Sequence, residues 1–193
     1  MNDHLIPVFE RILPAIERAG IRYWVYGGVA IAGIKGRFIR DNEDADVFVL
    51  GEDYSAVLDT VETPARSLGW TIQDTNFKDR PKREFFRQGS RKDVLSLMPA
   101  YRVGDLVRVV FQTSKIDFPL SMLNQQKRTL GSYIFSTPDT DFIKELFIHN
   151  LRYLVRSKKF RDRADLRNKY EIDAAVILNE SESDYFWGPY SNK

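Results

Sequence analysis

The stretch YWVYGGVAIAGI, residues 23–34, decides the fold of this 193-residue chain. It begins with β-branched and aromatic residues, which favour a strand, and the pair Gly27-Gly28 ends that run. The small and aliphatic residues 29–34 then predict a short helix. A glycine pair alone is most often a tight turn. At the positive end of a helix, however, glycines let backbone amides approach a phosphate.

Two aspartates precede the next predicted strand. Asp44 and Asp46 lead into the apolar run VFVL, residues 47–50, and side chains two apart in a strand share one face. Carboxylates this close repel each other unless a cation lies between them. Asp93 opens a later predicted strand and would complete an oxygen cage for magnesium. Each aspartate alone is ordinary at a strand edge, but their order predicts phosphoryl or nucleotidyl transfer.

These elements resemble the nucleotidyltransferase superfamily of the DNA polymerase β type, in its bacterial abortive-infection-type and antibiotic nucleotidyltransferase-like branch. That superfamily has a strand, a glycine turn and a helix, then Asp-x-Asp on a strand and a third acidic residue on a later strand. The match is close over residues 23–50 and looser over residues 5–178. Asn42 stands where Thr or Ser is usual, and Ala45 replaces a branched apolar residue. Residues 161–166, RDRADL, resemble the helical tail of the abortive-infection type, with an arginine in place of a lysine.

The resemblance implies roles for the three aspartates. Asp44 and Asp46 would bind Mg²⁺ or Mn²⁺ and carry catalysis. Asp93 would bind the catalytic metal and is a candidate to accept the proton of the nucleophile. The enzyme would then be a metal-dependent nucleotidyltransferase.

The resemblance also implies a nucleotide site. Gly27 and Gly28 would hold the triphosphate of an NTP, which is the co-substrate. Arg40 lies between the glycines and the aspartates, and we expect it to contact phosphate because its forked donors suit phosphate oxygens.

Strands and helices alternate through the first half of the chain, and a helical period takes over after residue 138. We expect an α/β (α+β) fold with a nucleotidyltransferase-type mixed β-sheet flanked by helices. Residues 1–130 would form the catalytic core, and residues 131–193 a helical region packed on it. We expect the final residues 180–193 to be an irregular tail, either docked or frayed.

The composition restricts the chemistry. The chain has no cysteine, which excludes disulfides, thiolate zinc sites, iron–sulfur clusters and a cysteine nucleophile. Its two histidines, His4 and His149, are far apart, so a bound metal would need carboxylate oxygens. No apolar run approaches the roughly 18 to 20 residues of a membrane span, and the start lacks a secretory pattern. We therefore expect a cytoplasmic protein without membrane contact.

The acceptor of the transferred group stays open. The net charge is only +2, but basic residues concentrate in segments 78–91 and 152–163, which could bind an RNA end or simply be solvated. A small molecule, an RNA end or a protein hydroxyl could each accept the nucleotide. The alternatives to a transferase are a non-catalytic module of the same fold, including a toxin–antitoxin component with an antitoxin partner, and a metal-dependent phosphatase.

Overall fold

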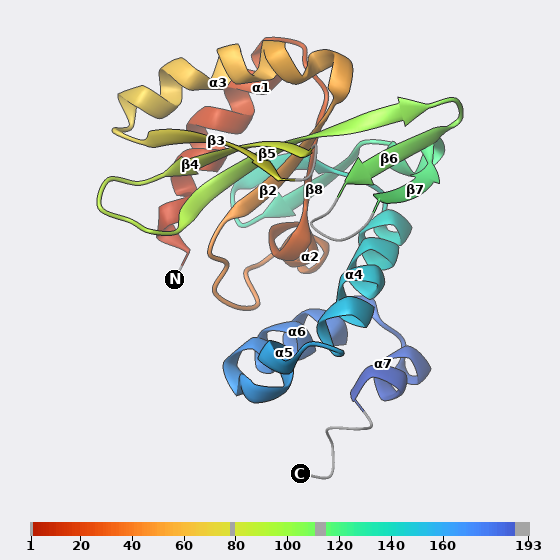
Figure 1. Cartoon of the computed structure of the whole chain (residues 1–193). Coiled ribbons are helices and arrows are strands. Elements are labelled where there is room, and N and C mark those ends of the chain that lie inside the picture. The colour runs from red at the N-terminus through yellow and green to blue at the C-terminus, as the bar shows by residue number, and fades with distance from the viewer. Residues whose placement is uncertain (1, 78–79, 111–114, 188–193) are drawn as a thin grey trace.

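The computed structural model describes residues 2–77, 80–110 and 115–187. Within these residues a mixed seven-stranded sheet forms the centre of the molecule (Figure 1), in the order β1-β2-β5-β4-β3, with β6 on the far half of β5 and β7 beside β6. The predicted α/β (α+β) class, with a mixed sheet flanked by helices, is confirmed. The strands of the sheet are β1 Tyr23–Tyr26, β2 Ala45–Leu50, β3 Thr71–Phe77, β4 Arg80–Phe86, β5 Asp93–Val103, β6 Leu106–Val110 and β7 Lys115–Pro119.

Helices cover both faces of the sheet (Figure 1). They are α1 Leu13–Arg18, α2 Gly27–Lys35, α3 Tyr54–Ser67, α4 Thr140–Leu154, α5 Lys158–Asp162, α6 Ala164–Ile177 and α7 Glu180–Trp187. Short helical turns lie at Asp3–Leu5, Val8–Ile12, Gly51–Asp53 and Leu120–Leu123. None of the helices in the described ranges has both the length and the apolar character that crossing a bilayer requires.

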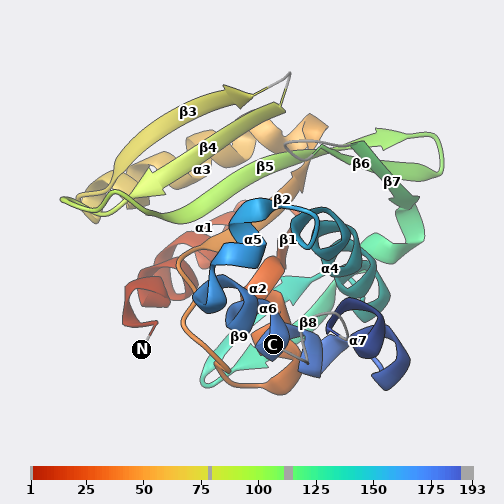
Figure 2. The same cartoon turned by 60° about the horizontal axis from the view of Figure 1, so that its bottom comes forward.

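The two faces of β2 belong to different cores. Val47 and Val49 pack in the cluster with α1 and α3, whereas Phe48 and Leu50 pack in the cluster with α4. Phe48 also stacks on Tyr26 of β1, with ring centroids 3.8 Å apart. Because side chains alternate along a strand, Asp46 shares the face of Phe48. The predicted site therefore faces the C-terminal helices, which gather beside α2 (Figure 2).

The basic segment 78–91 contains a strand. β4 pairs with both β3 and β5, so its basic residues lie inside the sheet and not in a connecting loop. Lys82 and Glu84 fall on one face of β4, while Phe85 packs on the other in the core with α3. Lys78 lies outside the described residues.

The C-terminal part is confirmed as helical from α4 onward, but a hairpin precedes it. Its strands, β8 Gln126–Leu130 and β9 Tyr133–Thr137, pair with each other, so the predicted boundary at 130/131 falls in the hairpin turn. The division into two domains stays a prediction. The expectation of an irregular tail is wrong for α7, which packs Phe186 into the core of the C-terminal helices. Residues 188–193 lie outside the described residues.

Helix α2 packs so closely on this hairpin that Gly33 has no room for a side chain. A Cβ there would lie 2.9 Å from Cζ of Phe135 and 3.1 Å from Cβ of Arg128. We expect Gly33→Ala to lower the free energy of unfolding by about 1 kcal/mol, because overpacking costs about 1–3 kcal/mol and outweighs the helix propensity gained. Urea denaturation measures this change. The same substitution in a Phe135→Leu background should cost less, and a stabilised Gly33→Ala protein would contradict the close packing.

Candidate active site

Helix α2 begins directly after β1, and its first two residues are the predicted glycines. Gly27 has a φ of 68°, in the left-handed region that suits glycine, and a Cβ there would lie 3.1 Å from Oδ2 of Asp46. A Cβ on Gly28 would collide with the guanidinium of Arg40 and the amide of Asn42. Both glycines are therefore needed, because the connection from α2 to β2 lies directly on the first turn of α2.

Asp44 and Asp46 lie at the start of β2, beside these glycines. Asp46 is opposite Tyr26 of β1, and Asp44 directly precedes the strand. Burial raises the pKa of Asp44 to about 8, and the negative charges of Asp46 and Asp93 add to the shift. The structure thus brings the two predicted carboxylates together in a poorly hydrated place.

One pocket contains both aspartates and both glycines. Its volume is about 140 Å³, and helices α4 and α6 form its other wall. Its lining residues are Tyr26, Gly27, Gly28, Ile31, Arg40, Asn42, Glu43, Asp44, Asp46, Ile143, Leu146, Phe147, Asn150, Lys169, Tyr170 and Asp173. The pocket is therefore acidic toward β2 and largely apolar toward α4.

Asp93 is close to the pair but lines a different hollow. In the parallel pairing of β2 with β5, the residue opposite Asp46 is Ser96. The Ser96 hydroxyl donates a 2.6 Å hydrogen bond to Oδ2 of Asp93, which fixes the orientation of that carboxylate. The hollow beside Asp93 has a volume of about 310 Å³ and shares only Asn42 and Glu43 with the pocket.

Lys82, from the basic segment 78–91 that could bind RNA or be solvated, lies beside Asp93. Nζ of Lys82 is 2.6 Å from Oε1 of Glu84 and 3.6 Å from Oδ2 of Asp93. Burial alone would lower the pKa of Lys82, but its hydrogen bond to Glu84 and the charges of Asp46 and Asp93 outweigh burial and raise it. Lys82 therefore stays charged and partly offsets the carboxylates. Its contact with Asp93 joins β4 to β5, and this contact leaves no local sequence signal.

Arg40 lines the pocket, but its guanidinium is held by Asp173 of α6. Nε donates to Oδ1 at 2.8 Å and Nη2 donates to Oδ2 at 2.6 Å, while Nη1 donates to the carbonyl of Asp41 at 2.8 Å. The Arg40 and Asp173 side chains are only 8% and 4% exposed. The phosphate contact of Arg40 stays a prediction, and a phosphate would have to share this guanidinium with Asp173.

Lys169 is a second cation of the pocket, one turn before Asp173 on α6. Its charge acts on Glu43, Asp44 and Asp173, yet it forms no ion pair within 4.0 Å in the recorded contacts of the described chain. Lys169 and Asp173 were not predicted as site residues from the sequence. The segment that resembles the family's helical tail is residues 161–166 instead. Asp162 and Asp165 of that segment are exposed, and neither lines the pocket; the Arg161 side chain lies outside the described part. A spacing of one helical turn puts Lys169 and Asp173 on one face of α6, but this spacing does not by itself place that face beside the carboxylates.

The carboxylate pair fits a divalent cation, although no ready cage exists. Among the described residues, no group of three or more His, Cys, Asp or Glu side chains is arranged to hold a metal ion. Mg²⁺, however, is usually held by one or two carboxylates together with substrate phosphates. Asp44 and Asp46 supply two such groups, and burial together with the charges of Asp46 and Asp93 raises the pKa of Asp44, so a cation bound there would be favoured. Asp93 as a third ligand stays a prediction.

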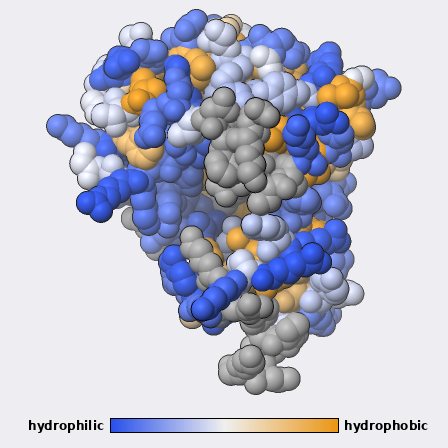
Figure 3. Space-filling view, in the orientation of Figure 1, coloured by the Kyte–Doolittle hydropathy of each residue, from blue (hydrophilic) through white to orange (hydrophobic). Residues whose placement is uncertain are grey.

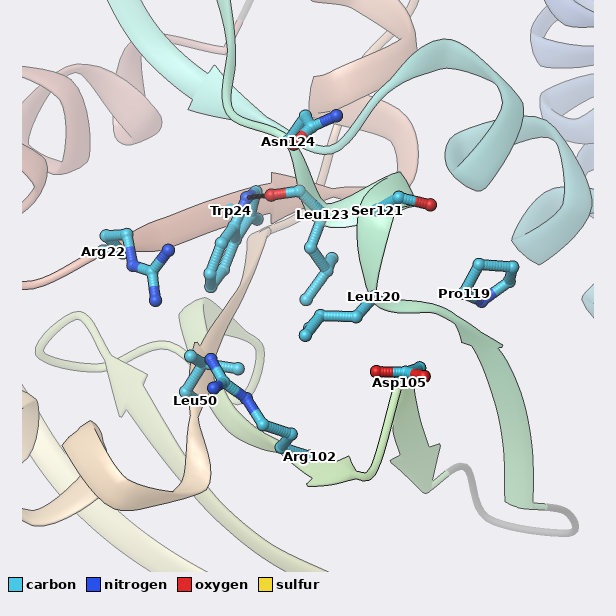
Figure 4. Close-up of a pocket in the computed structure, with 10 residues that line it drawn as sticks. All are labelled: Arg22, Trp24, Leu50, Arg102, Asp105, Pro119, Leu120, Ser121, Leu123 and Asn124. Carbon is cyan, nitrogen blue, oxygen red and sulfur yellow. Dashed lines mark hydrogen bonds between the residues drawn. The ribbon is translucent and has the colours of Figure 1, made fainter.

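A larger hollow lies at the opposite end of β2. It has a volume of about 560 Å³ and is bordered by Arg22, Trp24, Leu50 and Arg102 together with residues 119–124 (Figure 4). The Trp24 indole donates a 2.8 Å hydrogen bond to the carbonyl of Leu123 across its floor. It contains none of the predicted site residues.

The basic segment of the C-terminal helices lies on the surface. Arg152, Arg156 and Lys158 are exposed, and the lower part of Figure 3, which the C-terminal helices form, is largely hydrophilic. The side chains of Lys159 and Arg161 lie outside the described part. Arg152, Arg156 and Lys158 do not line the pocket, so these three described residues are not part of its wall.

The Arg40–Asp173 pair should contribute strongly to stability. Asp173→Ala leaves a buried guanidinium unpaired, and we expect the free energy of unfolding to fall by about 3–5 kcal/mol. Chemical denaturation measures the loss. Asp165→Ala is the matched control, because it removes an exposed partner of Arg163 on the same helix and should cost under about 1 kcal/mol. Equal losses in the two variants would contradict the role of the buried pair.

Comparison with known proteins supports this architecture. No family model matches the sequence, and no curated protein matches it. Among solved structures, ANT(2'')-Ia in complex with adenylyl-2''-tobramycin is similar at a TM-score of 0.63 and 16% identity, over 96% of this chain and 98% of that one. The lincosamide antibiotic adenylyltransferase LnuA, lincomycin-bound, gives 0.54 and 13%, over 86% and 93%. An antigenic nucleotidyltransferase-like protein from Paracoccidioides brasiliensis gives 0.51 and 13%, over 97% and 87%. The chain therefore has the fold of the nucleotidyltransferase superfamily, as its sequence pattern predicts.

Proposed function

We propose that this chain is a metal-dependent nucleotidyltransferase, which moves a nucleoside monophosphate from an NTP to a hydroxyl acceptor. One observation carries the proposal: in a chain of this fold, two half-buried carboxylates face the glycine-led start of a helix inside one pocket. The fold alone supports nucleotide transfer by analogy, and the site supports it by chemistry.

Asp44 and Asp46 would hold Mg²⁺ or Mn²⁺ against the triphosphate. A divalent cation bound there would offset the charge of the phosphates and of both carboxylates. The backbone at Gly27 and Gly28 would approach the phosphates at the positive end of α2. Within the described residues Lys169 forms no ion pair with a carboxylate, and we assign it a phosphate contact beside the predicted one of Arg40.

The acceptor would enter from the hollow beside Asp93. Its hydroxyl oxygen would form a bond to the α-phosphorus of the NTP while the bond to pyrophosphate breaks. The hydroxyl proton would pass to the Asp93 carboxylate, which Ser96 orients. The nucleotide and the acceptor would thus lie on opposite sides of Asn42 and Glu43, which border both spaces.

A binding-only module would have no use for two adjacent carboxylates that repel each other. Nothing in the described residues or in the comparisons favours an antitoxin partner, which stays a prediction. The phosphatase alternative requires phosphate release without an acceptor. The experiments below separate these possibilities.

Asp46→Asn should abolish transfer with little loss of fold. Removing a metal-binding charge should lower the rate at least about 1000-fold, because metal stabilisation of the transition state is worth several kcal/mol. Thermal unfolding with Mg²⁺ or Mn²⁺ and each NTP measures binding, and release of pyrophosphate measures transfer. Wild-type protein should be stabilised and the variant not.

The matched control is Asp59→Asn, which changes an exposed aspartate on α3. It should keep the wild-type response. A wild-type protein that responds to neither metal nor any NTP would refute the enzyme proposal.

Lys169→Met should weaken NTP binding about 10- to 100-fold, because a charge-assisted hydrogen bond is worth about 1.5–3 kcal/mol. Titration of the NTP in the presence of Mg²⁺ measures the affinity. Lys158→Met changes an exposed lysine outside the pocket and is the control. Unchanged affinity in Lys169→Met would remove Lys169 from the phosphate site.

The acceptor can be found with labelled NTPs. Wild-type protein and Asp46→Asn are incubated with RNA, protein and small-molecule fractions of a cell extract. We expect one fraction to gain label only with the wild-type protein. Phosphate release without labelling of any fraction would favour the phosphatase alternative.

A further inference from the structure

The pocket continues from the carboxylates into a slot between α4 and α6. One face of α4 borders this slot with residues at helical spacing, Ile143, Leu146, Phe147 and Asn150. Tyr170 of α6 borders it opposite, and Ile31 of α2 closes it from the sheet side. The slot is therefore built from three helices and lies beside the metal-binding carboxylates.

The slot is apolar and partly aromatic, unlike the carboxylate end. The rings of Phe147 and Tyr170 lie 5.9 Å apart between centroids, at an angle of 35°. Burial, together with the charge of Asp173, raises the pKa of Tyr170 to about 12, so its hydroxyl is neutral at physiological pH. Flat, weakly hydrated groups fit such a surface best.

Asn150 places a neutral hydrogen-bonding group in this apolar wall. Its amide carries two donors and one acceptor, and no hydrogen bond to another described residue is recorded for it. Apart from the Tyr170 hydroxyl, the other polar side chains of the pocket are charged or serve defined partners, as Arg40 and Asp173 do. An unpaired amide on an apolar wall gains most when a ligand with donors and acceptors on its edge binds there.

The order of groups along the pocket matches that of a nucleotide. Gly27 and Gly28 start α2, Ile31 lies one turn further along the same helix, and the slot begins at Ile31. A nucleoside triphosphate likewise has charged phosphates at one end and a flat base with a hydrogen-bonding edge at the other. The pocket volume of about 140 Å³ is below the roughly 300–1,000 Å³ of typical ligand pockets. It offers space for a base, while the phosphates would extend toward the open carboxylate end.

We propose that Asn150 determines base specificity: its side-chain amide hydrogen-bonds the edge of the NTP base, which packs against Phe147 and Tyr170. This inference rests on the proposed function and names the residue that selects the nucleotide. An amide can pair with one donor and one acceptor on a base edge, whereas a carboxylate can only accept. The carboxylate suits the adjacent N1–H and N2–H₂ donors of guanine and opposes the N1 acceptor of adenine.

Asn150→Asp should therefore change the ranking of nucleotides. The added charge weakens every NTP alike by repelling phosphate, so the ratio of GTP to ATP affinity is the quantity to measure. We expect this ratio to rise about tenfold or more over wild-type protein, measured by titration with Mg²⁺ present. Asn168→Asp adds the same charge at an exposed position of α6 and should leave the ratio unchanged.

A second measurement does not depend on the folding of that variant. Wild-type protein should bind ATP more tightly than purine riboside triphosphate, or GTP more tightly than ITP, because each analogue lacks the exocyclic amino group. Asn150→Ala should reduce that difference. If all NTPs bind but neither the ratio nor the difference responds to Asn150, or if only the KM of the acceptor changes, the inference is overturned and the proposed function stands. If wild-type protein binds no NTP, both fail.

Discussion

The buried ion pair between Arg40 and Asp173 joins the two parts of the chain on which the site depends. The two residues are 133 positions apart, and they connect the segment before β2 to helix α6. Two parallel hydrogen bonds offset the free-energy cost of removing both charges from water. Either charge buried without the other would destabilise the fold. The same guanidinium covers the first turn of α2 and requires glycine at position 28. The Asn2 side chain accepts from the backbone N–H of Asn42 and donates to the carbonyl of Arg40, so the segment is held from two sides.

The strand register explains why Asp44 and Asp46 line one pocket while Asp93 lies beside a separate hollow. Asp46 faces the C-terminal helices because it has the same parity as Phe48, and the parallel pairing with β5 brings Ser96 beside it. Asp93 lies three residues before Ser96, at the start of β5. Its carboxylate accepts a hydrogen bond from the Ser96 hydroxyl and lies 3.6 Å from Nζ of Lys82. Asp44 and Asp46, which we propose to bind the metal, and Asp93, the proposed base, thereby line different hollows. This division is useful for transfer, because the group that takes a proton from the acceptor must lie on the acceptor's side of the metal.

Local patterns predicted the local parts of this site well. Neighbouring residues alone determine these parts. The spacing of apolar side chains predicts the two strands and the helix, and the conformational freedom of glycine predicts the turn between β1 and α2. Lys169, Asp173 and Asn150 could not be found this way, because they enter the pocket only when α4 and α6 pack on α2. Strand β4 was not recognised for a related reason: its charged residues are neutralised by partners on β3, β5 and α3, such as Asp74 and Glu62 beside Arg83. Helix α7 forms because Phe186 packs against distant residues.

The pKa of Asp44 links metal binding to protons and to the C-terminal helices. A carboxyl whose pKa rises from 3.8 to about 8 keeps its proton in the folded protein over a range where the unfolded chain has lost it. Its contribution to stability is therefore present at low pH and is lost as the pH rises through about 8. A cation at Asp44 would displace that proton, so that its binding strengthens with pH. Desolvation is the largest cause of the shift, and α6 contributes to that burial by closing the pocket. Helix α6, which borders the proposed site of the nucleotide base, thus also contributes to the raised pKa of Asp44.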